Sequence, residues 1–481
     1  MDQELKNNKF GGNTVLFVMP DERLVYENVN VRVGAFHMPS LALAILSAIA
    51  KRNNYTPTIL DLGIQKDPAA SLKDTLLKLK PEYIGITCTS ATYGQAIQIA
   101  NISKEILQGI KVLVGGTHVS SLIEETLRNK CFDYVFAGEA DLSFAEFLRG
   151  TDPGAIDGIA FLDVEGRLRF RRNKDFLKNM DDLPPPDYTL YDLSEYRVSS
   201  LHAKNNPVVW LETSRGCPFN CQICNKVVHG QTFRPKSALK VISDIEYLLK
   251  LGVQEFHITD DGFTSDVRRA EEICDLIIEK KLKFTWACVN GIRVDRVNEG
   301  LLKKMRQAGC YSISFGIESG NQKVLDNLGK GITLEQIRSS VGMAKAAGLE
   351  VFGFFIFGFE DDTEETMRDT INFAKSLPLD LAKASIMMPF PGSPLYEKYN
   401  KEGLIYPAGD YRNFNTYMAP HKVYRHPSLN WSVVEAYQAK FYRSFYFSPG
   451  YILRRLEHAI RNKTIFNDIK LALKMEWFRK K

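Results

Sequence analysis

The sequence predicts an α/β protein: first a doubly wound, flavodoxin-like parallel sheet, then a partial (β/α)6 TIM-like barrel, and last a helical C-terminal region. Apolar strand-like runs alternate with helical runs five times in residues 1–150 and six times in residues 207–396. Between them, residues 181–187 read Asp-Asp-Leu-Pro-Pro-Pro-Asp, which cannot form a helix or a central strand. At 481 residues the chain is also too long for one ordinary core. We therefore expect a sheet domain over 1–150, a linker with a small hairpin over 151–206, the barrel over 207–396 and helices over 397–481.

The expected strands of the first domain are short buried runs that end in turn residues. Ser40 precedes an apolar helical run and is a good N-cap. No G-x-G-x-x-G fingerprint follows the first strand, so the pattern favours a flavodoxin-like sheet over the dinucleotide-binding type. The expected strands are residues 14–19, 58–62, 83–87, 111–115 and 134–136.

The expected barrel has six strand–helix units, so it is incomplete compared with an eight-stranded barrel. Parallel barrels place their chemistry at the carboxyl ends of the strands. The expected strands are residues 208–212, 255–259, 284–288, 312–317, 351–357 and 384–388.

The composition is that of an ordinary soluble protein in a reducing compartment. Hydrophobic residues make up 44% and charged residues 25%, and the formal net charge of +5 does not indicate a nucleic-acid binder. Only three of the eight cysteines cluster in the sequence. The first residues are polar, and no long apolar run is present. We expect a cytoplasmic protein without a spanning helix.

Cys217, Cys221 and Cys224 form a C-x3-C-x2-C motif just after the first expected barrel strand. Three thiolates in one loop can hold three irons of a [4Fe-4S] cluster and leave the fourth iron open. The alternatives are packing cysteines, a disulfide with a spare thiol, or a zinc site completed by His229. A Gly/Pro/Asn-rich loop after a strand of a long α/β chain favours the cluster.

This motif resembles the signature of the radical S-adenosylmethionine superfamily. The resemblance implies that the cluster splits S-adenosylmethionine and generates a 5'-deoxyadenosyl radical. It also implies that residues at the following strand ends bind S-adenosylmethionine: the Asp260–Asp261 pair at its amine, Arg293 at a carboxylate, Glu318 at the ribose or sulfonium, and an apolar strand at the adenine. The S-adenosylmethionine contacts implied by the resemblance are Phe219, Asp260, Asp261, Arg293, Glu318, Ser319, Gly358 and Pro389.

The loops that follow the strands of the first domain are rich in small and hydroxyl residues. Together with the cysteine motif they resemble the cobalamin-binding domain of a large subgroup of the superfamily. The chain departs from many such domains because it lacks Asp-x-His-x-x-Gly after the first strand, and His37 lies out of pattern. Two alternatives remain open: the domain binds cobalamin without a protein imidazole ligand, or it keeps the fold and has lost the cofactor. The implied cobalamin contacts are Pro39, Ser40, Thr87, Thr89, Ser90, Gly115, Gly116, His118, Gly138 and Glu139.

The resemblance implies a cobalamin-dependent radical S-adenosylmethionine enzyme that methylates an unactivated carbon of a small organic or lipid-like substrate. The alternatives are a cyclase, oxidase or rearranging enzyme acting on a tetrapyrrole, or a non-catalytic cobalamin- or metal-binding protein. A methylthiotransferase is disfavoured, since Cys88 and Cys131 are too few for a second cluster.

The expected partners are a small-molecule substrate and a one-electron donor of the flavodoxin or ferredoxin type. The basic, amphipathic end over residues 451–481 also suggests contact with an anionic membrane. The aromatic run over residues 441–447 is expected to cap the mouth of the active site.

Overall fold

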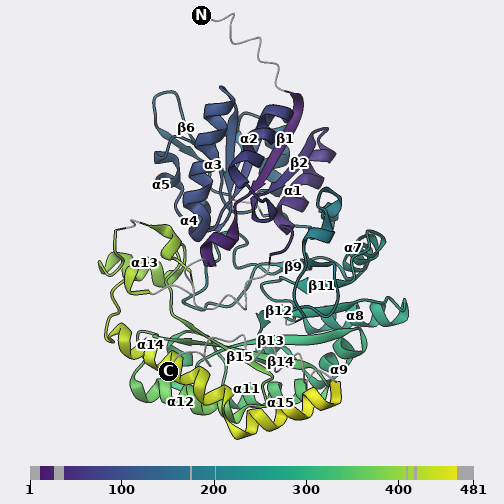
Figure 1. Ribbon diagram of the computed structural model, residues 1–481, viewed down its shortest axis with the longest axis vertical. Coiled ribbons are helices and arrows are strands. Elements are labelled where there is room, and N and C mark those ends of the chain that lie inside the picture. Colours follow the sequence, from purple (N-terminus) through teal and green to yellow (C-terminus); the bar gives the residue numbers. More distant parts are fainter. Residues whose placement is uncertain are drawn as a thin grey trace, which may run out of the picture.

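The computed structural model describes residues 11–26, 37–173, 176–200, 202–407, 410–415 and 420–462. Two sheets dominate this part of the chain: a seven-stranded sheet formed by the N-terminal half and a six-stranded sheet formed by the C-terminal half. Figure 1 shows the N-terminal sheet stacked above the barrel, with the linker running between them.

The N-terminal sheet has the strand order β2-β1-β3-β4-β5-β6-β7. Strands β1 to β5 are parallel, and the hairpin expected in the linker adds β6 and β7 in antiparallel pairing. This confirms the expected flavodoxin-like order and extends it by two strands. The strands are β1 Gly11–Met19, β2 Thr56–Asp61, β3 Pro81–Thr87, β4 Lys111–Gly115, β5 Tyr134–Phe136, β6 Ile159–Leu162 and β7 Leu168–Phe170.

Helices cover both faces of this sheet. α1 and α6 share an apolar cluster on one face, in which Phe17 packs against Phe144. α2 and α3 pack on the opposite face. Ser40 caps α1 as expected, because its Oγ accepts a hydrogen bond from the Leu43 amide at 3.3 Å. The helices are α1 Leu41–Arg52, α2 Pro68–Leu79, α3 Tyr93–Ile106, α4 Thr117–Ser121, α5 Ile123–Arg128 and α6 Asp141–Leu148.

The barrel sheet is parallel throughout, in the order β15-β14-β13-β12-β11-β8. Sequential order without closure confirms the expected partial barrel. Its strands are β8 Val208–Leu211, β11 Glu255–Ile258, β12 Thr285–Ile292, β13 Cys310–Glu318, β14 Glu350–Phe357 and β15 Leu381–Ile386. Its helices are α7 Ala238–Lys250, α8 Val267–Glu279, α9 Glu299–Gln307, α10 Gln322–Asn327, α11 Leu334–Ala346 and α12 Glu364–Ser376.

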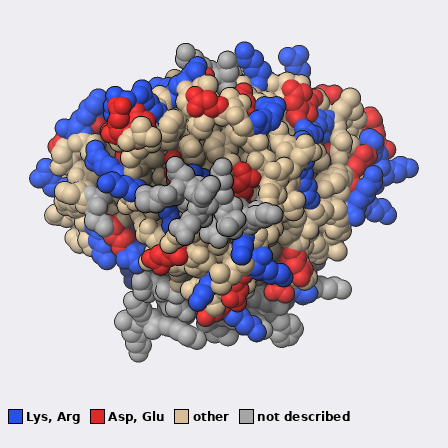
Figure 2. Space-filling model, turned by 90° about the horizontal axis from the view of Figure 1, so that it is seen from above, with Lys and Arg blue, Asp and Glu red and all other residues tan. Residues whose placement is uncertain are grey.

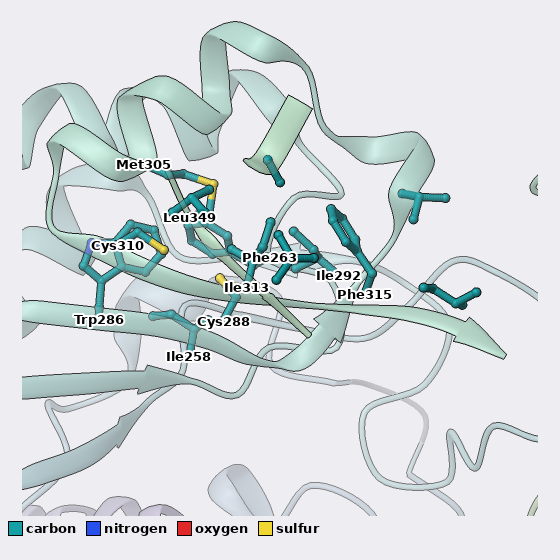
Figure 3. Packing of buried hydrophobic residues seen from close by; sticks show 14 of the residues in the cluster. Ile258, Phe263, Trp286, Cys288, Ile292, Met305, Cys310, Ile313, Phe315 and Leu349 are labelled. Atoms are coloured by element: carbon teal, nitrogen blue, oxygen red, sulfur yellow. The ribbon is translucent and has the colours of Figure 1, made fainter. Parts of the chain in front are cut away.

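Alternate side chains of the barrel strands point outward and pack beneath the helices. In Figure 3, Trp286 and Cys288 of β12 lie beside Cys310 and Ile313 of β13, under Met305 of α9. Burial raises the pKa of the Cys310 and Cys288 thiols above the ordinary value. These cysteines are therefore packing residues, as expected for thiols outside the motif.

The C-terminal helices are α13 Pro394–Lys401, α14 Trp431–Tyr446 and α15 Pro449–Asn462. α14 covers the edge strand β15, where the Tyr442 hydroxyl bonds both the amide and the carbonyl of Ala384 at 3.0 Å. Tyr446 does the same at Ala382. The prediction that this aromatic run caps the mouth of the barrel is therefore wrong. An edge strand exposes unpaired amide and carbonyl groups, and the two tyrosine hydroxyls bond such groups on β15.

The surface seen from the N-terminal end carries basic and acidic side chains interspersed (Figure 2). No continuous field of one sign is visible on this face, in keeping with the small net charge. Within the described ranges, no helix is both long and apolar enough to cross a membrane.

Candidate functional site

The cysteine loop leaves the barrel at the end of β8 and is closed at its base by a short antiparallel ladder. β9 Ser214–Arg215 pairs with β10 Arg234–Pro235. Gly216 has φ +80°, and a Cβ there would lie 2.2 Å from the carbonyl oxygen of Thr232. Only glycine fits this turn, so the loop enters its cysteine segment in a fixed direction.

Within the loop, Cys221 is buried, Cys217 is half-buried and Cys224 is exposed. The neighbouring Cys224 thiol and the positive charges of Lys330 and Arg293 lower the pKa of Cys221, although burial acts in the opposite direction. A low thiol pKa favours the thiolate that metals bind. The donor set therefore fits an iron–sulfur cluster held by three thiolates.

The zinc alternative finds no support at His229. The Nδ1 of that imidazole lies 3.0 Å from the Glu139 carboxylate of the N-terminal domain, so the ring is already engaged there.

Arg293 and Phe219 meet beside the cysteine loop. The Arg293 guanidinium lies 3.7 Å from the centre of the Phe219 ring, in cation–π contact. Asp295 holds two of its nitrogens at 2.8 and 3.1 Å, while the third, NH1, is buried and has no hydrogen-bond partner among the residues that the structure describes. A buried guanidinium nitrogen without an acceptor suits a ligand carboxylate, which is the role the sequence suggests.

Glu318 ends β13 with φ +66° and points its carboxylate toward Lys330, whose Nζ lies 2.6 Å from Oε1. Lys330 follows α10 and is a site residue that sequence reasoning missed. The signal was present as Gly329-Lys330-Gly331, a turn that directly follows the helix after Glu318.

Two of the S-adenosylmethionine contacts implied by the resemblance are engaged in holding the site together. Asp260 is buried and accepts hydrogen bonds from the Thr213 amide and hydroxyl and from the Ser214 hydroxyl. Ser319 is buried against Thr370, with the two hydroxyl oxygens 3.1 Å apart. Both side chains bond neighbouring segments of the protein, and these contacts explain their burial without a ligand.

Asp261 is exposed, and one of its oxygens accepts the Gly216 amide at 3.1 Å. Its second oxygen has no hydrogen bond among the described residues, so Asp261 rather than Asp260 keeps an oxygen for an ammonium group.

Gly358 and Pro389 lie at the ends of the last two barrel strands. Gly358 has φ +84°, and a Cβ there would lie 3.0 Å from Val434 of α14. The glycine is thus explained by close packing of the C-terminal helix. Pro389 is buried between β15 and α13. The adenine role of this region stays a prediction.

The N-terminal domain contains an open cavity at the carboxyl ends of its strands. Phe17 of β1 and Phe144 of α6 are among the apolar residues that line it. Five of the implied cobalamin residues line this cavity: Thr87, Gly115, Gly116, Gly138 and Glu139. An open, mainly apolar cavity with a glycine-rich rim can receive part of a large organic cofactor.

The other implied cobalamin residues are not among those that line this cavity. Ser40 caps α1, Pro39 is buried, and Thr89 bonds within its own turn. His118 lies on the opposite side of its loop, where Nδ1 contacts Ser90 and the ring packs 4.1 Å from the Tyr93 ring. Burial lowers the pKa of His118 to about 4, so it is neutral there.

His37 is also occupied, since its Nε2 lies 2.7 Å from Asp61 and its ring stacks on Tyr196. It therefore faces a buried carboxylate in this structure.

A buried charge network joins the cavity to the cysteine loop. Arg215, two residues before Cys217, pairs with Asp141 and Glu212 and lies 3.7 Å from Glu139. Glu139 also binds Arg234 and His229. Burial alone would raise its pKa, but the hydrogen bonds from His229 and Arg234 and the charge of Arg215 lower the pKa of Glu139 to about 2. The two domains thus meet in one ionic cluster that sequence reasoning did not identify.

Comparison with known proteins agrees with this geometry. The radical SAM superfamily model matches residues 211–374, and the B12 binding domain model matches residues 27–148. An uncharacterized methyltransferase of Pyrococcus horikoshii is 32% identical over 453 residues, covering 92% of this chain and 95% of that protein. The anaerobic magnesium-protoporphyrin IX monomethyl ester cyclase of Rubrivivax gelatinosus is 24% identical, covering 83% of this chain and 72% of its own.

Two solved structures share the whole architecture. The cobalamin-dependent S-adenosylmethionine radical enzyme OxsB superimposes with a TM-score of 0.72 at 19% identity, covering 90% of this chain and 67% of OxsB. The radical S-adenosylmethionine methyltransferase TsrM from Kitasatospora setae gives 0.67 at 18% identity, covering 82% of this chain and 76% of TsrM. At these identities the likeness establishes the fold. Taken with the two domain matches and the relative that spans nearly the whole chain, it shows that the protein belongs to the cobalamin-binding radical S-adenosylmethionine enzymes.

Proposed function

We propose that this enzyme methylates an unactivated carbon of a small organic or lipid-like substrate. One observation carries the proposal: residues of the cysteine loop form a wall of the cavity in the N-terminal domain. Arg215, Val228 and His229 line that cavity together with the sheet residues. A radical formed at the loop and a methyl donor held in the cavity would therefore adjoin one substrate space.

The cofactors are a [4Fe-4S] cluster, S-adenosylmethionine and cobalamin; when bound, they supply the electron, the 5'-deoxyadenosyl radical and the methyl group. The protein's own residues position them. Arg293 offers a buried nitrogen to a carboxylate, and Asp261 offers an oxygen to an ammonium. The Glu139–Arg215 network holds the loop against the cavity, away from water.

Relatives support methyl transfer as the outcome. They include a cytidylyl-2-hydroxyethylphosphonate methyltransferase of Streptomyces wedmorensis, 24% identical over 76% of this chain. A second candidate is ring closure or oxidation of a tetrapyrrole, favoured by the 83% of this chain that aligns with the Rubrivivax cyclase. The two outcomes differ in what happens to the methyl group of S-adenosylmethionine.

Isotope labelling separates them. Protein loaded with iron, sulfide and hydroxocobalamin without oxygen is given methyl-deuterated S-adenosylmethionine and a strong reductant. A methyltransferase forms both 5'-deoxyadenosine and S-adenosylhomocysteine, with the label on cobalamin. If 5'-deoxyadenosine forms while the label never leaves S-adenosylmethionine, methyl transfer is refuted and the cyclase outcome remains.

Blocking the cavity is expected to remove cobalamin without unfolding the protein. Ala42 lines the cavity but is exposed on α1, so Ala42→Trp places an indole in the opening at little packing cost. We expect at least a tenfold weaker binding of hydroxocobalamin, measured by its absorbance after gel filtration. Ala69→Trp, at an exposed site on α2 that does not line the cavity, is the matched control. Unchanged cobalamin binding in Ala42→Trp would show that the cofactor lies elsewhere.

The enzyme takes a small-molecule substrate and an external electron. We propose a flavodoxin or ferredoxin in a reducing cytoplasm as the source, in keeping with eight cysteines that are all free.

We also propose that α15 contacts anionic membrane. Four apolar side chains lie on one side of this helix and are 49%, 67%, 50% and 60% exposed: Ile452, Leu453, Leu456 and Ile460. Arg454 and Arg455 lie next to this stripe. An exposed apolar stripe with neighbouring arginines is typical of helices that lie in a membrane interface. The rest of the expected basic tail lies outside the described residues.

Replacing two leucines of the stripe is expected to release the protein from vesicles. Each buried leucine contributes about 1.5–3 kcal/mol, so Leu453→Glu with Leu456→Glu should weaken binding to phosphatidylglycerol vesicles at least tenfold. Cosedimentation measures this. Leu77→Glu, at a lone exposed leucine of α2, is the control. Equal binding by wild type to anionic and neutral vesicles, or no binding to either, would refute the membrane contact.

A further inference from the structure

Lys330 is a buried ammonium placed against the cysteine loop. Its side chain is only 10% exposed, and that of its partner Glu318 is 12% exposed. Burying an ammonium is costly, and a single ion pair often fails to recover the cost. A lysine kept in this position therefore calls for a further explanation.

The backbone of the turn holds Lys330 in place. Gly329 and Gly331, on either side of it, have φ of +70° and +64°. The carbonyl of Leu328 accepts the Gln222 amide at 3.1 Å. A Cβ on Gly329 would lie 3.1 Å from the carbonyl oxygen of Asn220. The turn is thus pressed against the residues on both sides of Cys221.

The ammonium itself lies close to strand β13. A Cβ built on Gly316 would lie 2.9 Å from Lys330 Nζ and 2.7 Å from Glu318 Oε1. The ion pair therefore lies against Gly316, near the carboxyl end of β13. The ammonium belongs to the turn that contacts Asn220 and Gln222, so its charge lies next to the Cys221 segment.

We propose that Lys330 is an electrostatic positioning residue of the cluster, whose fixed charge makes the cluster easier to reduce. This inference rests on the proposed radical function, because it assigns Lys330 an electrostatic role at the same cluster. Each electron added to a thiolate-bound cluster increases its negative charge, so a nearby buried cation stabilises the reduced state more than the oxidised one. Hydrogen bonds and charges around the sulfurs are general determinants of cluster potential.

The test is a redox titration followed by electron paramagnetic resonance, without S-adenosylmethionine. Lys330→Met removes the charge and keeps the chain length. At a fixed potential we expect about a tenfold lower ratio of reduced to oxidised cluster, a negative shift of about 59 mV for one electron. Lys330→Arg keeps the charge and should stay within threefold of wild type. Lys345→Met, which breaks the ion pair with Asp380 on the outer helix α11, is the matched control and should not shift.

Lys330→Gln provides a second reading if the methionine variant loads poorly, since it keeps a hydrogen bond to Glu318 without the charge. Iron and sulfide per chain are measured in every variant to show that the cluster is present. An unchanged potential in both neutral variants, or an equal shift in the arginine variant, would overturn the proposal. Formation of 5'-deoxyadenosine by wild type tests the underlying function separately, so failure of one is distinguishable from failure of the other.

Discussion

Cys221→Ala is expected to abolish formation of 5'-deoxyadenosine. Cys221 is the buried thiol of the motif, and the neighbouring Cys224 thiol lowers its pKa. Without Cys221 the loop offers only two thiolates, so the cluster would lose one of its three protein ligands. Product formation should fall at least 1,000-fold, to background, as estimated from the complete loss of the bound electron carrier.

The measurement is 5'-deoxyadenosine by chromatography after anaerobic loading, with iron and sulfide counted on the same sample. Cys131→Ala is the control, because that thiol is buried in the N-terminal domain away from the loop. It should keep the cluster and the activity. Product formation by Cys221→Ala at more than a few per cent of wild type would contradict the assignment of the motif.

The sequence allowed the fold to be predicted because the signals were local. The alternation of strand and helix is set by short apolar runs, and both sheets have the expected strand order. The cysteine spacing is equally local, since three ligands lie within eight residues. The small residues at the strand ends of the first domain predicted the rim of the cavity for the same reason.

The parts that could not be predicted depend on contacts between distant segments. Asp260 reads as a ligand at a strand end, yet it folds back on Thr213 and Ser214. The aromatic run on α14 reads as a lid, yet its tyrosines bond an edge strand. A strand or helix pattern does not show which distant segment a side chain will contact. The link between Glu139 and Arg234 spans 95 residues and leaves no periodic trace.

That link leads to the second large effect, a loss of stability in Glu139→Gln. Glu139 is 6% exposed, and it faces Arg234, Arg215 and His229. Removing one member of a buried ion cluster leaves its partners as uncompensated charges, which typically costs about 3–5 kcal/mol. The free energy of unfolding, from urea denaturation at neutral pH, should fall by about that amount. Glu165→Gln, which breaks an exposed pair at the β6–β7 turn, is the control and should cause no measurable change.

The pH dependence distinguishes loss of charge from loss of packing. Because the pKa of Glu139 is lowered to about 2 in the folded protein, its contribution is fully present above its unfolded value of about 4.3 and is lost as pH falls toward 2. The His229 imidazole acts in the opposite direction: burial opposes its protonation, but the Glu139 hydrogen bond raises its pKa above the ordinary value. Its contribution is therefore present in acid and lost as pH rises through that raised pKa. Glu139→Gln should flatten the acidic segment and weaken the other, because Glu212 and Asp261 also raise the pKa of His229. A variant as stable as wild type, or a curve with both segments intact, would show that this network does not hold the two domains together.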